Sequence, residues 1–146
     1  MTPAQVCELW NDAELEVRDE LMMSKALSNS YAMAAAFAPL DAVPGMLAGR
    51  PAFRTAEVID PSAFKMIGFA RVISDGAFAA LLLDVVVHPD FRRNGIGRRI
   101  VNLLMKKCIK EGASACVVFA PRERMFFWKC GFRWSNRYKV MSMPEE

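Results

Sequence analysis

We predict a mixed α/β (α+β) fold in one domain covering all 146 residues, because three consecutive features indicate it. Residues 77–87, an almost continuous run of alanine, leucine and valine, indicate a strand buried on both faces. The glycine-containing segment 92–97 follows directly. Residues 95–111 then place Ile100 and Leu104 on one face of a helix, with charged residues opposite. A buried strand, a glycine-rich turn and an amphipathic helix in this order are typical of α/β architecture.

The other expected elements complete a sheet with helices around it. The turn pair Asp75-Gly76 predicts that a strand over 64–76 forms a hairpin with residues 77–87. Segment 30–39 fits a helix or a strand, and its aromatic residues and final proline favour the strand. The remaining expected elements are helices over 3–10 and about 16–29, a loop over 40–62, a strand over 113–121, a short helix over 122–130 and one or two closing strands over 132–143.

Composition excludes several classes of protein. The hydrophobic fraction of 53% excludes a disordered chain. No apolar run reaches the roughly 20 residues needed to cross a bilayer, so we expect no membrane partner. The four cysteines lack CxxC or zinc-finger spacing, which indicates reduced intracellular thiols and no metal site. We expect a cytoplasmic location, or a plastid one if a transit peptide has been removed.

Charge is distributed unevenly along the chain. The formal net charge is +3, yet residues 1–60 carry 4 Lys and Arg against 9 Asp and Glu, whereas residues 61–146 carry 15 against 7. An acidic front can attract a cationic substrate, and a basic back can attract an anionic cofactor. Accidental surface charge is the alternative interpretation.

The segment "HPDFRRNGIGRRIV" (88–101) is the main functional signal. Its glycines let the backbone approach a ligand, and the first amides of the following helix lack intrahelical partners. Together with the helix dipole they form an anion site. The dinucleotide pattern GxGxxG does not fit, because Ile100 stands where its third glycine belongs, and the phosphate loop GxxxxGK[ST] is absent. A solvated basic turn is the alternative.

These residues resemble the GNAT superfamily of acyl-CoA-dependent N-acyltransferases. "VVVHPDFRRNGIGRRIV" (85–101) matches a strand ending in Val-x-Pro followed by [RQ]xxGx[GA] at a helix start. "FFWKCGF" (126–132) matches the later family pattern FYxKxGF. The likeness covers residues 64–143. Shorter phrases such as "CVVFAP" (116–121) are similar to the plastid and cyanobacterial branch, which includes serotonin N-acetyltransferases and plastid protein acetyltransferases.

The resemblance implies a GNAT-like, mostly antiparallel sheet in which the strand over 83–87 splays away from its neighbour. It also implies acetyl-CoA as cosubstrate, with the pantetheine arm in the gap. An amide of residue 85 or 86 would then serve as an oxyanion hole. The residues implied in cofactor binding are Asp84, Val85, Val86, Arg92, Arg93, Asn94, Gly95, Ile96, Gly97, Arg98 and Phe127.

Candidate catalytic residues follow from the chemistry of amine transfer. An alkyl amine has a pKa near 10.4, so we expect a base to assist its deprotonation. Asp84 and His88 lie at alternating positions of one strand and share a face with Val86. A hydrogen-bonded structural aspartate and a surface histidine are the alternatives. Glu123 is a third candidate base, or a charge at a helix start.

The sequence departs from the family at the residue that usually protonates the leaving thiolate. Phe127 stands in place of the tyrosine of FYxKxGF and has no proton to donate. Tyr138, Tyr31 or a water could substitute, and a thiol with a pKa near 8.5 can also leave as thiolate. A CoA-binding regulatory or interaction module with little or no turnover is therefore the rival hypothesis.

We predict an acetyl-CoA-dependent N-acetyltransferase that transfers acetyl directly to a primary amine. The acceptor is an arylalkylamine such as serotonin or a protein lysine, and the protein is a monomer or a homodimer. We expect no nucleic-acid partner, because the basic residues surround one helix without aromatic residues between them.

Overall fold

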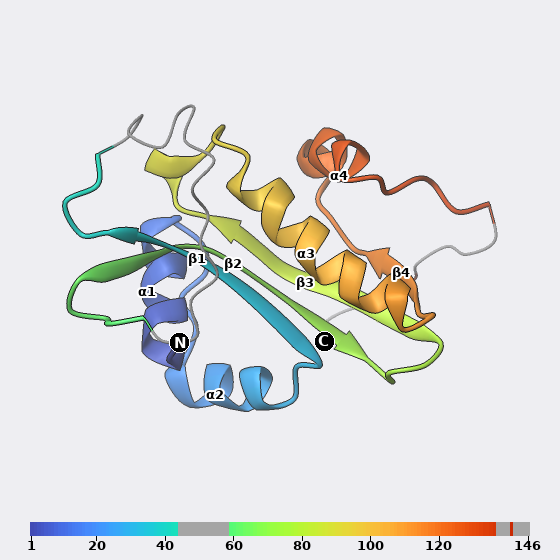
Figure 1. Ribbon diagram of the computed structural model, residues 1–146, viewed down its shortest axis with the longest axis horizontal. Helices are drawn as coiled ribbons and strands as arrows, with labels where there is room; N and C mark the ends of the chain where they lie inside the picture. Colours follow the sequence, from blue (N-terminus) through green and yellow to red (C-terminus); the bar gives the residue numbers. More distant parts are fainter. Residues whose placement is uncertain (44–58, 137–140, 142–146) are drawn as a thin grey trace.

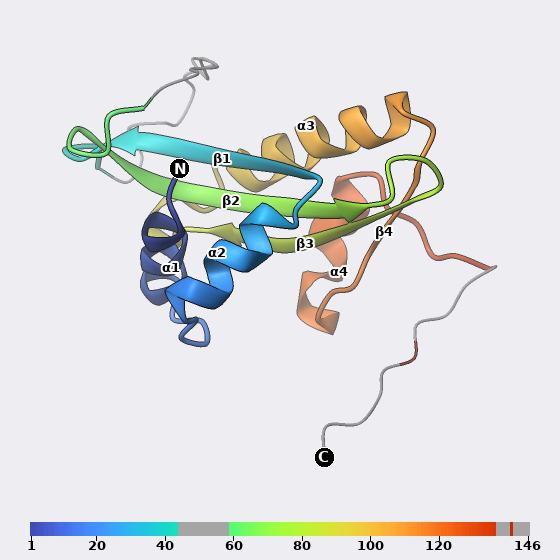
Figure 2. The same cartoon turned by 90° about the horizontal axis from the view of Figure 1, so that it is seen from below.

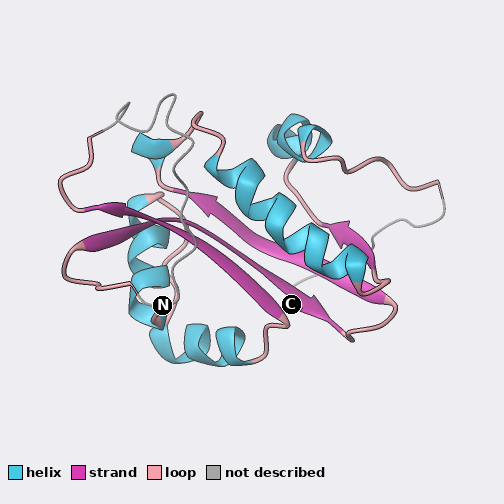
Figure 3. Ribbon diagram, in the orientation of Figure 1, coloured by secondary structure: helices cyan, strands magenta, loops and turns pink. Residues whose placement is uncertain are grey.

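The computed structural model describes residues 1–43, 59–136 and 141, and in these residues the sheet has four strands (Figures 1 and 3). Their spatial order is β1 (Ala32–Pro39), β2 (Phe64–Ser74), β3 (Ala79–Val87) and β4 (Ser114–Val117). The first three are antiparallel, and β4 runs parallel to β3. The predicted mixed, mostly antiparallel sheet is confirmed.

Helices cover both faces of this sheet. Figures 1 and 2 show α3 (Ile96–Lys110) across one face and α1 (Pro3–Asp12) and α2 (Glu20–Ser28) against the other. Because β3 and β4 are parallel, the chain must cross over between them, and α3 is that crossover. The 3-10 turn η2 (Pro121–Glu123) leads from β4 into the short helix α4 (Arg124–Lys129).

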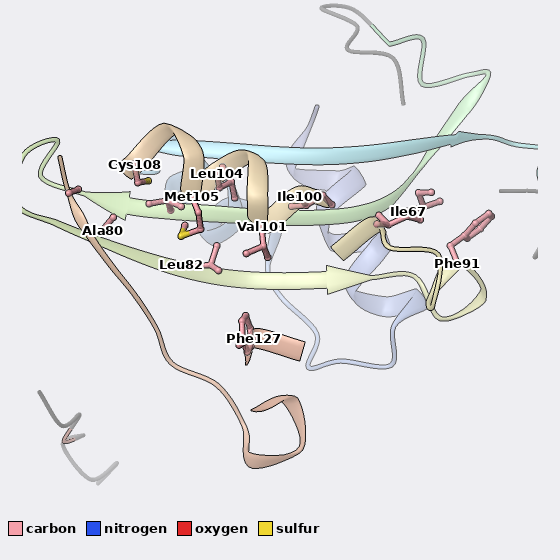
Figure 4. Packing of buried hydrophobic residues seen from close by; sticks show 14 of the residues in the cluster. Ile67, Ala80, Leu82, Phe91, Ile100, Val101, Leu104, Met105, Cys108 and Phe127 are labelled. Carbon is pink, nitrogen blue, oxygen red and sulfur yellow. The ribbon is translucent and has the colours of Figure 1, made fainter. Parts of the chain in front are cut away.

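Two apolar clusters fill the space between the sheet and the helices. The cluster under α3 includes Leu82 and Val101, neither of which is exposed, together with residues of α4 such as Phe127 (Figure 4). The cluster under α1 includes Trp10 and Val86. The sheet is thus covered on both faces, as expected for its continuous apolar strands.

Several element boundaries differ from the sequence-based expectation. The second helix begins at Glu20 rather than near residue 16, because the Asp19 carboxylate accepts the Met22 N–H at 2.9 Å and caps it. The last described strand ends at Val117 rather than at 121. The closing strands expected over 132–143 are wrong for residues 132–136, which form no strand, and the rest lies outside the described residues apart from residue 141.

Among the described residues, no helix has the length and apolar character needed to cross a bilayer.

Candidate active site

The site begins where β3 loses one of its two neighbours. Residues Ala79–Leu82 pair with β4, and the last pair joins Leu82 to Val117. On the other side, β3 stays paired with β2 as far as Val87. The end of β3 is therefore open toward β4, which confirms the expected splay of these two strands.

A cleft of about 390 Å³ occupies this opening. Residues of β3 line one side of it, and the others come from α1 and the segment after it, from the end of β4, and from η2 and α4. Its lining residues are Trp10, Leu15, Glu16, Arg18, Leu82, Leu83, Asp84, Val85, Val86, Val117, Val118, Glu123 and Phe127. The cleft thus brings Asp84, Val85, Val86 and Phe127 together, four of the residues predicted to bind the cofactor.

A β-bulge shapes the β3 side of the cleft. Leu83 pairs with Arg71 and Val86 with Phe69, so Asp84 and Val85 together stand opposite a single β2 residue. Asp84 has a left-handed φ of 55°, which is uncommon outside glycine but is tolerated by aspartate. The bulge turns the strand at the point where it leaves β4.

The Asp84 carboxylate is held by two guanidinium groups. One oxygen accepts a hydrogen bond from Arg71 Nε, and the other lies 3.1 Å from an Arg18 terminal nitrogen. The Asp84 and Arg71 side chains are 10% and 12% exposed, whereas Arg18 is 39% exposed and stacks over the Trp10 ring. This ion pair supplies the partner that an aspartate in an aliphatic strand requires. To accept a proton, Asp84 would have to release one of these partners.

The predicted anion loop lies between η1 (Pro89–Phe91) and the start of α3. Arg93 and Gly95 both have left-handed φ values, 67° and 76°. The first turn of α3 closes with the Arg99 N–H donating to the Gly95 carbonyl at 3.0 Å. The amides of Ile96, Gly97 and Arg98 precede that bond and have no acceptor within the helix. Together with the helix dipole, these amides make the start of this 15-residue helix a favourable place for an anion.

Side chains around this loop divide into those that shape it and those that face solvent. The Asn94 amide donates to the carbonyls of Phe91 and Arg92 at 3.1 and 3.2 Å, so this side chain closes the loop. Arg92 Nε donates to the Val87 carbonyl at 3.1 Å and ties the loop to the end of β3. Arg93 and Arg98 are exposed and free to meet an anion.

The two glycines have different structural roles, and the expectation that both make room for a ligand stays a prediction. A Cβ on Gly95 would contact nothing within 4 Å, so this position needs glycine for its φ. Gly97 is buried, and a Cβ there would lie 3.1 Å from the Phe126 ring and 3.2 Å from Val87. Gly97 therefore allows α3 to pack closely against α4 and β3.

A second hollow, also about 390 Å³, continues from the loop along the outer side of α3. It is lined by Gly95, Arg98, Arg99, Asn102, Leu103 and Lys106. Its positive charge extends the field of the anion loop along the helix.

Phe127 lies at the junction of the cleft and the core. It is 4% exposed, and its ring centroid is 4.9 to 5.9 Å from those of Phe119, Phe126 and Phe132. Figure 4 shows it extending from α4 toward β3. Burial raises the pKa of the Cys130 thiol in the same segment, which makes that cysteine a weak nucleophile.

Two further candidates for proton transfer, His88 and Tyr31, do not line the cleft. His88 shares the α1 side of the sheet with Asp84, as predicted, but its ring contacts Asp12 of α1 and does not line the cleft. It is 7% exposed, so the alternative of a surface histidine is wrong. Tyr31 donates its hydroxyl to Glu111 at the end of α3. Tyr138 lies outside the described residues.

Sequence reasoning missed part of the site. Arg71, Arg18 and Trp10 come from three segments, and all three surround Asp84 or line its cleft. The available signal was Arg71, the charged residue within the apolar run 66–73 of β2, which matches Asp84 in the apolar run of β3. Glu123 does line the cleft, and its carboxylate accepts the Ala120 N–H at 3.0 Å.

Comparison with known proteins agrees with this geometry. Residues 58–134 match the family model described as acetyltransferase (GNAT) domain. A segment of 72 residues is 39% identical to an uncharacterized N-acetyltransferase, ycf52, of Porphyra purpurea, covering 49% of this chain and 41% of that protein. Another 72-residue match is 36% identical to the chloroplastic serotonin N-acetyltransferase 2 of Oryza sativa subsp. japonica, covering 49% and 36%. The matched segments thus span less than half the length of these curated relatives.

The fold has solved counterparts. A protein of unknown function from meticillin-resistant Staphylococcus aureus, described as a probable acetyltransferase, superposes with a TM-score of 0.70 over 99% of this chain and 94% of its own, at 17% identity. The family match covers more than half of the chain and includes the splayed strands, the anion loop and α4. The chain therefore belongs to the GNAT acetyltransferase domain family.

Proposed function

We propose that this chain is a single N-acetyltransferase domain that uses acetyl-CoA and transfers the acetyl group directly to a primary amine. The observation that carries the proposal is the cleft between β3 and β4, from which β3 leads into the anion loop at the start of α3. A thioester carrying several phosphate charges needs both features: an open strand for its arm and free amides for its pyrophosphate. Acetyl-CoA would supply the activated acetyl group.

The chain's own residues provide positioning and charge stabilisation. The amides of Ile96, Gly97 and Arg98 bind the pyrophosphate, with Arg93 and Arg98 as counter-charges. The open edge of β3 orients the pantetheine arm. An amide of Val85 or Val86 stabilises the oxyanion that forms when the amine attacks the carbonyl, an effect worth about 10²–10³ in rate.

Few side chains along the cleft can deprotonate the amine or protonate the leaving thiolate. Asp84 can act as base only with the loss of an ion pair, and Glu16 and Glu123 are further carboxylates along the cleft. Phe127 cannot protonate the thiolate, so CoA leaves as the thiolate or takes its proton from water or from Tyr138. Slow turnover, rather than loss of cofactor binding, is the expected consequence.

The acceptor is a cationic amine, either an arylalkylamine such as serotonin or a protein lysine. Glu16 and Glu123 at the cleft support a positively charged acceptor. The relative from rice, named as a chloroplastic serotonin N-acetyltransferase, supports the small amine and a plastid location.

Calorimetric titration of the purified protein with CoA, followed by thiol release from acetyl-CoA over a panel of amines and lysine peptides, tests the proposal. Arg98→Ala should weaken CoA binding, whereas Lys110→Ala, a matched charge removal at the far end of α3, should not. Binding without release on any acceptor would favour the regulatory module. Absence of CoA binding would sink both hypotheses.

A further inference from the structure

We infer that His88 is a positioning residue for CoA: its buried imidazole holds the turn from which the anion loop starts and so sets the affinity of that loop. The inference rests on the proposed use of CoA. It replaces the catalytic role for His88 that the sequence suggested.

The imidazole is enclosed by residues of three different segments, α1, β2 and η1. Among the described residues, His88 is the only polar residue that is buried, at 7% exposure. Its ring meets Phe91 edge-on, with the centroids 5.6 Å apart. The charged groups around it are Asp12 on α1, Lys65 on β2 and Asp90 in η1. A side chain held in this way keeps one orientation.

The hydrogen bonds of the ring determine its tautomer. The Asp90 N–H donates to Nδ1 at 3.2 Å, so Nδ1 carries no proton in this arrangement. The ring N–H is then at Nε2, which lies 3.5 Å from an Asp12 carboxylate oxygen. Lys65 Nζ is also 3.5 Å from Nε2, but two donors cannot bond to each other.

The bond at Nδ1 caps η1, and a series of contacts connects η1 with the loop. Arg92 donates its N–H to the Pro89 carbonyl at 3.3 Å. The Phe91 carbonyl then accepts the Asn94 amide at 3.1 Å, one residue before the left-handed Gly95. Each contact fixes the position of the next backbone segment relative to η1, as far as the amides at the start of α3.

Loss of the Nδ1 acceptor affects binding through preorganisation. The Asp90 amide loses a partner in a part-buried position, so the turn no longer has one favoured geometry. A loop that becomes ordered only on binding loses conformational entropy in that step, and this loss weakens its affinity for the ligand. His88 therefore influences the binding of CoA rather than the acetyl-transfer step.

Two amide substitutions separate the two ring nitrogens. His88→Asn retains an acceptor oxygen near the place of Nδ1, whereas His88→Gln places its polar group near Nε2 and leaves the Asp90 amide without an acceptor. We expect calorimetry to give a CoA Kd for H88Q about tenfold above that of the wild type, from the loss of one hydrogen bond, and for H88N within about threefold. In acetyl transfer, H88Q should raise KM for acetyl-CoA far more than it lowers kcat.

Three outcomes would overturn the inference. Equal CoA affinities of H88N, H88Q and the wild type would show that Nδ1 does not organise the loop. An equal, large fall of kcat in both variants would point to a catalytic base, since neither amide can act as one. Imidazole nitrogen chemical shifts of the wild-type protein should report the Nε2–H tautomer, and the Nδ1–H tautomer would contradict the geometry even if a variant fails to fold. A wild-type protein that binds no CoA would instead refute the proposed function, and this inference with it.

Discussion

The two halves of β3 have similar sequences and different environments. Ala79–Leu82 lies between β2 and β4, while Leu83–Val87 is paired with β2 alone. In the first half, Leu82 is fully buried in the cluster under α3. In the second half, the bulge at Asp84 moves Val86 to the cluster under α1 and opens a cleft. An aliphatic strand thus comes to line a cleft through the loss of one neighbour.

The two halves of β3 also differ in charge. The paired half contains no charged residue, whereas the open half includes Asp84 with its two arginine partners. A bulge and a buried ion pair both cost free energy, and such features are common beside active sites. They are tolerated here because the rest of the sheet is well packed.

The largest expected effect comes from breaking the ion pair in the open half. Asp84→Asn preserves the size and the tolerance of a left-handed φ, but it leaves the Arg71 guanidinium without a charged partner. Urea unfolding should show a loss of about 3–5 kcal/mol. Arg18→Gln is the matched control, because Arg18 is 39% exposed and should cost only about 0–1 kcal/mol. Equal losses would mean that the pair is not buried in solution.

Restoring the family's tyrosine across the cleft is the next largest change. Phe127→Tyr adds a hydroxyl to a ring that lines the cleft opposite β3, and we expect kcat to rise by up to about 10². The gain stays at the lower end of general acid catalysis because a thiolate leaves without full protonation. Phe126→Tyr, with the same hydroxyl on a ring against Gly97, should give no gain. An unchanged rate in both would show that protonation does not limit turnover.

One added methyl group where α3 packs against the end of β3 should lower the stability of the protein. Gly97→Ala brings a Cβ against Phe126 and Val87 and should cost about 1–3 kcal/mol in unfolding free energy. Phe126→Leu in the same chain should recover part of this loss, because the ring is the contact that must move. The same second change should not rescue Gly95→Ala, whose cost comes from its φ. Equal rescue would contradict the different roles of the two glycines.

The smallest expected effect is a pH dependence at the turn that begins the paired half. The Asp75 carboxylate accepts the amides of Ala77, Phe78 and Ala79, which lowers the pKa of Asp75 below its usual 3.8. The pKa of Asp75 is lower in the folded protein than in the unfolded chain. The stability that its ionised carboxylate contributes is therefore present above the unfolded pKa and is lost as pH falls through the folded pKa. Urea midpoints of the wild type and Asp75→Asn should therefore differ at pH 7, approach each other as pH falls below about 3.8, and become equal only below the folded pKa. A pH-independent difference would contradict the linkage.

How much of the site can be predicted depends on how local its parts are. The anion loop follows from Arg92, Gly95 and the periodic helix after them, because a helix start needs only neighbouring residues. The packing role of Gly97 cannot be predicted from its neighbours in the chain, since Phe126 reaches it from a helix more than twenty residues away. The closing strands predicted over 132–143 are wrong for the described residues 132–136, because periodicity and β propensity alone do not provide a pairing partner.

The sequence by itself determined the order of the helices and strands up to α4, the glycine-containing loop around Gly95 and the family. These depend on local backbone preferences and on short motifs. Only the tertiary structure decided where β3 opens, which groups neutralise Asp84 and which way His88 faces. Those outcomes depend on contacts between segments far apart in the chain, such as Asp12 with His88 and Arg18 with Asp84. Their free energies arise from burial and charge pairing that exist only once the sheet and helices have assembled.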